Sequence, residues 1–145
     1  MNRFSRWAAT LVVLSGSGGT FAATAEAAAT QPPRANCANP ADQLTMNRCA
    51  DLDFRAADHK LNDTYAQLTR RVTPQGQASL QKAERAWLAY RNAQCDFLTS
   101  AQTSYSAQPM LYSMCLARLT RAQTALLDEQ LHCAEGDIGC GQQQK

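Results

Sequence analysis

Hydrophobic side chains recur every three or four residues over most of the chain that follows residue 41. Such spacing places them along one face of an α-helix. In the first segment the spacing predicts a helix of about 30 residues, and Asn39 or Asp42 can cap its start. The stripe on this helix consists of Leu44, Asn47, Ala50, Phe54, Ala57, Leu61, Tyr65, Leu68 and Val72.

Two further helices are predicted after the first. Thr73 can cap the second helix, with Pro74 at its first position, and the stripe consists of Leu80, Ala83, Trp87, Tyr90, Gln94, Phe97 and Ala101. A polar connection over residues 99–108 precedes a third helix, which Pro109 can open. Its stripe consists of Leu111, Cys115, Leu119, Ala122, Leu126 and Leu127. The sequence has no convincing run of alternating β-branched residues, so strands are not expected.

These elements predict an all-α fold. Short connections make sequential helices antiparallel neighbours, so we expect an antiparallel helical hairpin with a third helix packed along it. Arg91 is expected to pair with a carboxylate of the first helix, such as Asp58. The expected core side chains are Phe54, Leu61, Tyr65, Trp87, Tyr90 and Phe97.

The first 29 residues have a different composition. Arg3 and Arg6 precede a short apolar run over residues 7–14, and small residues follow, ending in alanines. This order is typical of a secretory signal peptide, here residues 1–29, with cleavage between about residues 25 and 29. The apolar run is shorter than the roughly 20 residues that span a bilayer. We therefore expect a periplasmic or secreted protein without membrane insertion after cleavage.

The remaining chain divides into a polar leader (residues 30–41), a helical domain (residues 42–132) and an irregular tail (residues 133–145). Removing the signal peptide takes away two of the 14 basic residues and one of the 12 acidic residues, which leaves a formal charge of +1. A charge so close to zero provides no long-range attraction for nucleic acid. Nucleic acid is therefore not an expected partner.

All six cysteines follow the signal peptide, and an even number in a small exported domain indicates disulfides. Cys95 and Cys115 lie equally far, roughly 15 Å, from the centre of the second connection, so they are level across two antiparallel helices. Cys49 and Cys95 would be offset by roughly 9 Å, beyond the ~7 Å limit for an unstrained disulfide. We therefore expect the pairs Cys37–Cys49, Cys95–Cys115 and Cys133–Cys140.

The sequence offers little catalytic chemistry. It has no Cys-x-x-Cys motif, and His59 and His132 each stand apart from a serine or free cysteine at motif spacing. The carboxylates on the first helix, Asp51, Asp53, Asp58 and Asp63, are spread around it. We therefore expect no enzyme activity, no catalytic residues, no metal and no cofactor, and a protein that acts by binding.

Four short motifs resemble the lysozyme-inhibitor LprI-like N-terminal domain family of small exported bacterial proteins. They are Met46-Asn47-x-Cys49, Leu61-Asn62-x-x-Tyr65, Trp87-x-x-Tyr90-Arg91-x-x-x-Cys95 and Cys115-Leu116-x-x-x-Thr120. The resemblance covers about residues 37–131. It departs from the family pattern at Glu84, where glutamine is common, and at Asn92, where aspartate is common. The resemblance implies a helical fold, export and inhibition of lysozyme.

Two functions are compatible with these observations. The first is a lysozyme inhibitor of the bacterial envelope that blocks the substrate cleft. The alternative is a periplasmic structural or adaptor protein that binds another envelope component. Loops are the expected contact points, either residues 73–77, with Pro74 and Gln75, or residues 99–108, with Tyr105.

Overall fold

The computed structural model describes residues 35–102, 105–134 and 136–141. The expected signal peptide, residues 1–29, lies outside these ranges. The described residues form helices and no strand, which confirms the all-α class. The helices are α1 (Gln43–Thr69), α2 (Pro74–Thr99), the 3-10 turn η1 (Ser100–Gln102) and α3 (Gln108–Leu131). No helix among the described residues has the length and hydrophobicity that a membrane crossing requires.

Capping side chains set the starts of α1 and α2. Asp42, rather than Asn39, caps α1, because its Oδ1 accepts a hydrogen bond of 2.7 Å from the backbone N–H of Thr45. Thr73 caps α2, where its Oγ1 accepts from the N–H of Gly76 over 3.1 Å, and Pro74 takes the first helical position. Each cap provides a partner for a backbone N–H group that lacks one within the helix.

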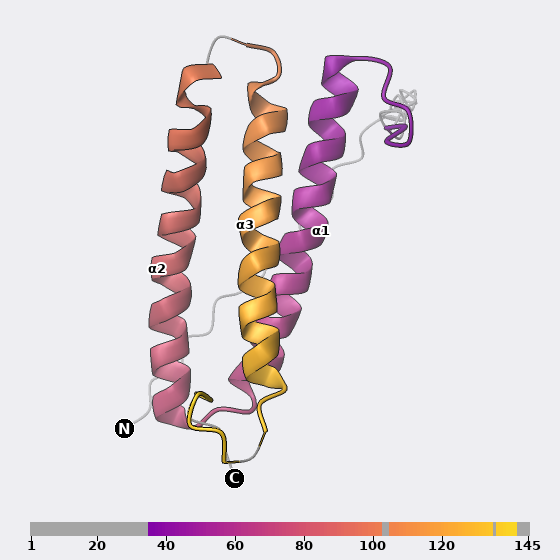
Figure 1. The fold of residues 1–145 in the computed structure, drawn as a ribbon. Helices are drawn as coiled ribbons and strands as arrows, with labels where there is room; N and C mark the ends of the chain where they lie inside the picture. Colours follow the sequence, from indigo (N-terminus) through magenta and orange to yellow (C-terminus); the bar gives the residue numbers. More distant parts are fainter. Residues whose placement is uncertain (1–34, 103–104, 135, 142–145) are drawn as a thin grey trace, which may run out of the picture. The chain divides into compact units, whose positions relative to one another are not determined.

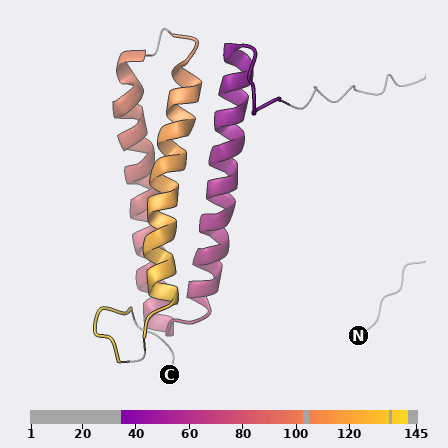
Figure 2. The same cartoon turned by 45° about the vertical axis from the view of Figure 1, so that its right-hand side comes forward.

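The first and third helices form the main interface of the bundle. They run in the same direction, and α2 runs opposite to both (Figure 1). Figure 2 shows α3 between α1 and α2. The third helix packs mainly on α1, whereas α1 and α2 barely contact each other. Small buried side chains lie on both helices of this interface and allow a close approach. They are Ala50, Ala57 and Thr64 on α1, and Ala117 and Thr120 on α3.

The core has two clusters, one in each half of the bundle. Near the α1–α2 connection, Leu61, Leu68, Val72, Leu127 and Leu131 are buried, and Tyr65, Leu80 and Trp87 pack against them. In the other half, Cys95, Cys115 and Leu116 are buried, with Phe54, Tyr112 and Leu119 packed against them. Four of the six expected core side chains therefore lie in or against these clusters: Phe54, Leu61, Tyr65 and Trp87.

The other two expected core residues, Tyr90 and Phe97, are exposed, and the prediction for them is wrong. Their side chains are 55% and 73% exposed. The inward face of α2 is instead formed by Trp87, Arg91, Cys95 and Thr99, which follow one another at four-residue steps and include a buried cation. The face of α2 that points into the bundle is therefore not the face that the hydrophobic pattern predicts.

Three disulfides brace the chain, and helix geometry favours one of them, Cys95–Cys115. Cys37 is bonded to Cys49, Cys95 to Cys115, and Cys133 to Cys140. The Cα atoms of each pair are 5.5, 5.7 and 5.9 Å apart, in the same order. Only the Cys95–Cys115 bond joins two helices of the bundle, α2 and α3.

Candidate functional site

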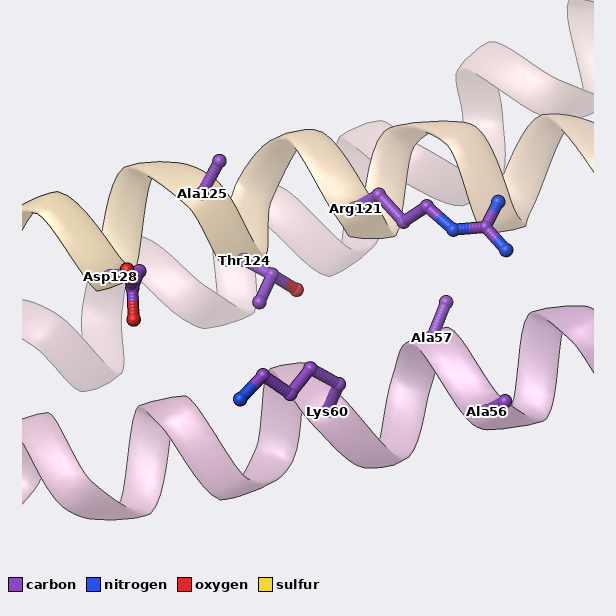
Figure 3. Close-up of a pocket in the computed structure, with 7 residues that line it drawn as sticks. All are labelled: Ala56, Ala57, Lys60, Arg121, Thr124, Ala125 and Asp128. Carbon is purple, nitrogen blue, oxygen red and sulfur yellow. The ribbon is translucent and has the colours of Figure 1, made fainter.

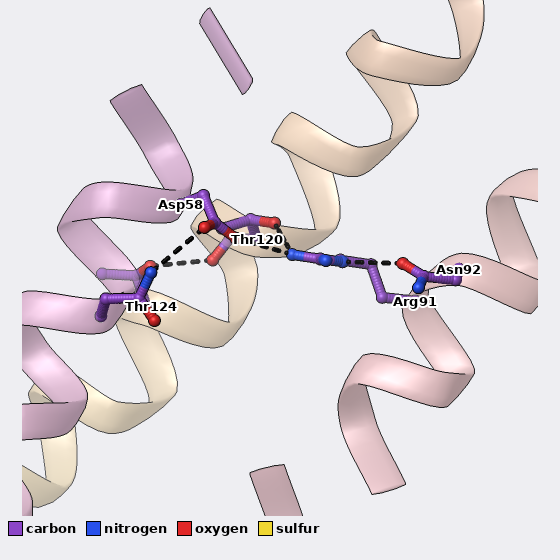
Figure 4. Close-up of polar contacts among 6 residues, drawn as sticks. Asp58, Arg91, Asn92, Thr120 and Thr124 are labelled. Carbon is purple, nitrogen blue, oxygen red and sulfur yellow. Dashed lines mark hydrogen bonds and ion pairs between the residues drawn. The ribbon is translucent and has the colours of Figure 1, made fainter. Parts of the chain in front are cut away.

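Arg91 lies at the centre of the bundle and contacts all three helices. Its side chain is 9% exposed, and Nη1 donates to Oδ1 of Asp58 on α1 over 3.0 Å and to Oγ1 of Thr120 on α3 over 3.2 Å. Figure 4 shows the guanidinium pointing from α2 toward these two partners. The pairing of Arg91 with Asp58 confirms the expectation from the sequence.

Two aromatic rings complete the surroundings of Arg91. The guanidinium carbon is 5.3 Å from the centre of the Phe54 ring and 5.1 Å from that of Trp87. A cation over an aromatic face is attracted by the ring quadrupole. Its position between two rings and two oxygen partners makes Arg91 a structural residue that ties α2 to α1 and α3.

A groove between α1 and α2 opens beside this arginine. Because the two helices barely contact each other, a cavity of about 420 Å³ remains between them. Charged and polar side chains surround much of it, among them Asp58, Asn62, Gln81, Glu84, Arg85 and Arg91. It is therefore a place where a small polar group could be held.

Glu84 is the unusual member of this groove. Its Oε2 atom is buried and has no hydrogen-bond partner among the described residues. Burial raises the pKa of this carboxyl above its ordinary value of 4.5, and the charge of Asp58 adds to the rise, while Arg91 opposes it. An unpartnered buried carboxylate oxygen is costly, so the groove contains an acceptor that a bound donor could satisfy.

A second hollow, of about 540 Å³, lies between α1 and α3 (Figure 3). Figure 3 shows Ala57 pointing from α1 toward α3 and Thr124 pointing from α3 toward α1, and the short alanine and threonine side chains of the lining leave the space. Its charged side chains, Lys60, Arg121 and Asp128, are exposed, and Arg121 forms an ion pair with Asp53. This hollow is a shallow surface feature without a buried reactive group among its lining residues.

The two expected contact loops lie at opposite ends of the bundle. Pro74 and Gln75 are exposed at the α1–α2 end, which is the end formed by the α1–α2 connection and the last turn of α3. Tyr105 is 67% exposed at the α2–α3 end (Figure 1). The 26 residues of α2 separate the two ends by about 39 Å. One narrow cleft cannot contact all three side chains.

The α1–α2 end carries exposed arginines on a fixed turn. Arg70 and Arg71 are both exposed, and they line a cavity of about 260 Å³ with Gln67, Leu131 and His132. Arg71 Nη1 donates to the carbonyl oxygen of Leu131 over 2.7 Å, which fastens the connection to α3. Gln77 Nε2 donates to the carbonyl oxygen of Thr69 over 3.0 Å and holds the turn from its other side.

The histidines and the tail offer no reactive centre in the part of the chain that the structure describes. His59 lies 3.0 Å from Asp63 and His132 lies 3.4 Å from Asp128, each one helical turn away on the surface. Cys133, Asp137 and Cys140 form a close group, with their ligand atoms within 4.8 Å of one another. The two sulfurs are bonded to each other, so neither is available as a thiolate ligand.

Glu84 and Thr120 lie near Arg91 in the interior and were not predicted to do so from the sequence. Cys95 was a usable signal, because a cysteine bonded to another helix must face inward. Arg91 precedes it by one turn and Glu84 precedes Arg91 by two turns, so they share that inward side of α2. No comparable signal exists for Thr120, whose buried hydroxyl is recognisable only from its contact with Arg91.

These features define a class: small helical proteins braced by disulfides, whose described residues form surfaces and grooves suited to binding. The family model described as lysozyme inhibitor LprI matches residues 35–127, and the chain belongs to this family. The matched region contains α1, α2, most of α3 and two of the three disulfides.

One curated relative covers most of both chains. It is the uncharacterized protein R02472 of Rhizobium meliloti (strain 1021), which is 39% identical over 122 residues, or 72% of this chain and 85% of the relative. No solved structure matches the chain.

Proposed function

We propose that this protein is an exported inhibitor of lysozyme that acts by binding rather than by catalysis. The observation that carries the proposal is the match of residues 35–127 to the lysozyme inhibitor LprI family. Three disulfides support a location in an oxidising compartment, the periplasm or the exterior of the cell. Residues 1–29 would be the signal peptide, 30–41 a leader, 42–132 the inhibitory domain and 133–145 a tail.

We further propose that the α1–α2 end enters the substrate cleft. Lysozyme catalysis depends on two carboxyl groups that flank the scissile bond in a sugar-binding cleft. Arg70 is an exposed cation beside Pro74 and Gln75, on a turn that hydrogen bonds hold in place. A guanidinium can donate two parallel hydrogen bonds to one carboxylate. The narrow end of a helical bundle also presents these groups without much surrounding bulk.

The test is an inhibition assay with purified, oxidised protein and lysozyme acting on cell walls. Wild-type protein should slow lysis in a dose-dependent way. The variant Arg70→Ala/Gln75→Ala should weaken inhibition by about tenfold or more, as expected for central interface residues. Tyr105→Ala, at the other end, is the matched control and should inhibit like wild type.

Different outcomes test the binding mode, the function and the signal peptide separately. Loss of inhibition in Tyr105→Ala alone would move the contact to the α2–α3 end and contradict the binding mode. No inhibition by wild-type protein at a large molar excess would contradict the function. N-terminal sequencing of the exported protein should show a start between residues 26 and 30, and an intact start at Met1 would contradict the proposed signal peptide.

A second candidate function, binding of another envelope component, is favoured by the α1–α2 groove. The unpartnered Glu84 Oε2 would accept from an amino group, and Arg85 on the groove's edge would attract a carboxylate. Cell-wall peptides carry both groups. Wild-type protein should therefore bind such a peptide in calorimetry, and Glu84→Gln should weaken this binding without changing lysozyme inhibition.

A further inference from the structure

The outer face of α2 carries an exposed stripe that no other part of the described chain covers. Tyr90 and Phe97 are 55% and 73% exposed, and the residues between and before them on this face are also exposed. The stripe runs Ser79, Ala83, Ala86, Tyr90, Ala93 and Phe97. Its spacing alternates between four and three residues, which is the spacing of a coiled-coil seam. Large exposed side chains at this spacing mark a surface for another helix.

We propose that this stripe pairs with the same stripe of a second copy, with the two α2 helices antiparallel. A symmetric dimer brings identical surfaces together, so the stripe must fit itself. The sizes of its side chains satisfy this condition in the register that pairs all six positions of the stripe. In that register Tyr90 lies opposite Ala86 of the second copy, and Phe97 lies opposite Ser79. Every aromatic ring then faces a small side chain, and the remaining layers pair Ala83 with Ala93.

The charges beside the stripe select the same register. Lys82 and Asp96 are both exposed and lie on the same edge of the stripe, two heptads apart. In the antiparallel register described above, Lys82 of each copy lies next to Asp96 of the other, which gives two identical ion pairs. A parallel pairing would instead stack Tyr90 on Tyr90 and Phe97 on Phe97, and it would leave these charges apart. Charge complementarity therefore favours the antiparallel dimer.

A cavity adjoins the position where Phe97 of the second copy would arrive. This hollow of about 310 Å³ is lined by Ser79 and Ala83 of the stripe, together with Gly76, Leu80 and Leu127. Gly76 has no side chain, and most of the lining residues are apolar. An aromatic ring placed opposite Ser79 can fill this space. The dimer therefore has a hollow for the Phe97 ring at each end of the paired stripes.

The stripe does not include Arg70, Pro74 or Gln75, the residues proposed to contact lysozyme. The antiparallel arrangement places the two α1–α2 ends at opposite ends of the dimer, each beside the α2–α3 end of the other copy. Burial, and then the nearby carboxylate of Asp96, raise the pKa of the Tyr112 hydroxyl, and a carboxylate can accept from a tyrosine and from a lysine together. The inference therefore does not depend on lysozyme as the partner.

The experiment measures the molecular mass of the oxidised, full exported protein by sedimentation equilibrium from micromolar to near-millimolar concentration. Wild-type protein should approach twice the monomer mass. Lys82→Asp and Asp96→Lys should each weaken dimerisation about tenfold, because symmetry turns both ion pairs into repulsive pairs. The double variant Lys82→Asp/Asp96→Lys should return to within about threefold of wild type.

Two further variants test whether the dimer depends on the stripe itself or is weakened by a new charge anywhere on the surface. Phe97→Asp should abolish the dimer, because a carboxylate would be buried in an apolar hollow. Leu52→Asp changes a side chain on α1 that is 53% exposed and should leave the dimer unchanged. A monomer at every concentration would overturn the proposal, and so would a double charge variant that stays as weak as the single ones.

Discussion

Arg91 and Asp58 form the ion pair that connects α2 to α1, two helices that otherwise barely touch. The Nη1 and Oδ1 atoms are 3.0 Å apart, and the side chains are 9% and 36% exposed. Removing the arginine would take away this pair, the Thr120 hydrogen bond and the contacts with two aromatic rings. The pair is therefore the main polar link that positions α2.

From this link we predict that Arg91→Ala lowers the free energy of unfolding by about 3 kcal/mol, and that Asp58→Asn lowers it by about 1 kcal/mol. The smaller effect follows from the partial exposure of Asp58. Chemical denaturation followed by circular dichroism measures both values. Asp51→Asn, which breaks the exposed pair with Arg55, is the control and should change little. Equal effects of all three variants would contradict this view.

The raised pKa of Glu84 predicts a pH-dependent stability. The folded state binds the proton of Glu84 more tightly than the unfolded state does. Protonation of Glu84 therefore stabilises the fold fully below the ordinary pKa of 4.5, and this stabilisation is lost as the pH rises through the pKa of Glu84 in the folded protein. At neutral pH the charged carboxylate of Glu84 destabilises the folded state, because its loss of hydration on burial is the largest influence on its pKa. Glu84→Gln should therefore raise the melting temperature at neutral pH, and the gain should disappear near pH 4.

Glu129→Gln, an exposed position on α3, provides the control for this effect. It should leave the melting temperature unchanged at both pH values. If Glu84→Gln were destabilising at neutral pH, the attraction of Arg91 would outweigh the burial of the carboxylate, and the direction of the pKa shift would be wrong.

The disulfides should differ in their contribution to stability. Cys95–Cys115 closes a segment with a sequence separation of 20 and joins α2 to α3, so replacing both residues by alanine should cost about 3 kcal/mol. Cys133–Cys140 closes a short segment after α3, with a separation of 7. Its loss should barely move the unfolding transition of the bundle, because few bundle contacts depend on it. Thermal melts of the two double variants measure the difference, and similar losses would contradict it.

Phe97 is exposed and Trp87 is partly buried, so replacing them should have different effects on stability. At protein concentrations where the chain is monomeric, Phe97→Ser should change the free energy of unfolding by less than about 0.5 kcal/mol. Trp87→Ala should lower it by about 3 kcal/mol, because Trp87 packs on the buried leucine cluster and on Arg91. A large loss in Phe97→Ser would restore the sequence-based prediction that this residue belongs to the core.

Helix positions were predictable from the sequence because the signals are local. Asp42, Thr73, Pro74 and Pro109 are cap and first-turn residues, and the structure uses them near the starts of the three helices. The Cys95–Cys115 pair was also predictable, since it depends only on helix rise and connection length.

The orientation of α2 about its own axis was not predictable from hydrophobicity. The rule that apolar residues face inward favoured Tyr90 and Phe97, yet Arg91 lies inside, where Thr120 and the Phe54 ring join its expected partner Asp58. The contacts with Thr120 and Phe54 come from two other helices and form only in the folded chain. For the same reason the groove with Glu84 could not be recognised, since it exists because α1 packs on α3 in preference to α2.

The dominance of the α1–α3 interface has a consequence for biosynthesis. The helix that completes the interior is the last one to be made, and the two that precede it have little to bury against each other. A nascent chain ending before Gln108 therefore lacks half of its principal interface and has no reason to become compact. We therefore expect such a polypeptide to stay extended until the third helix is made, a form that would suit the export proposed above.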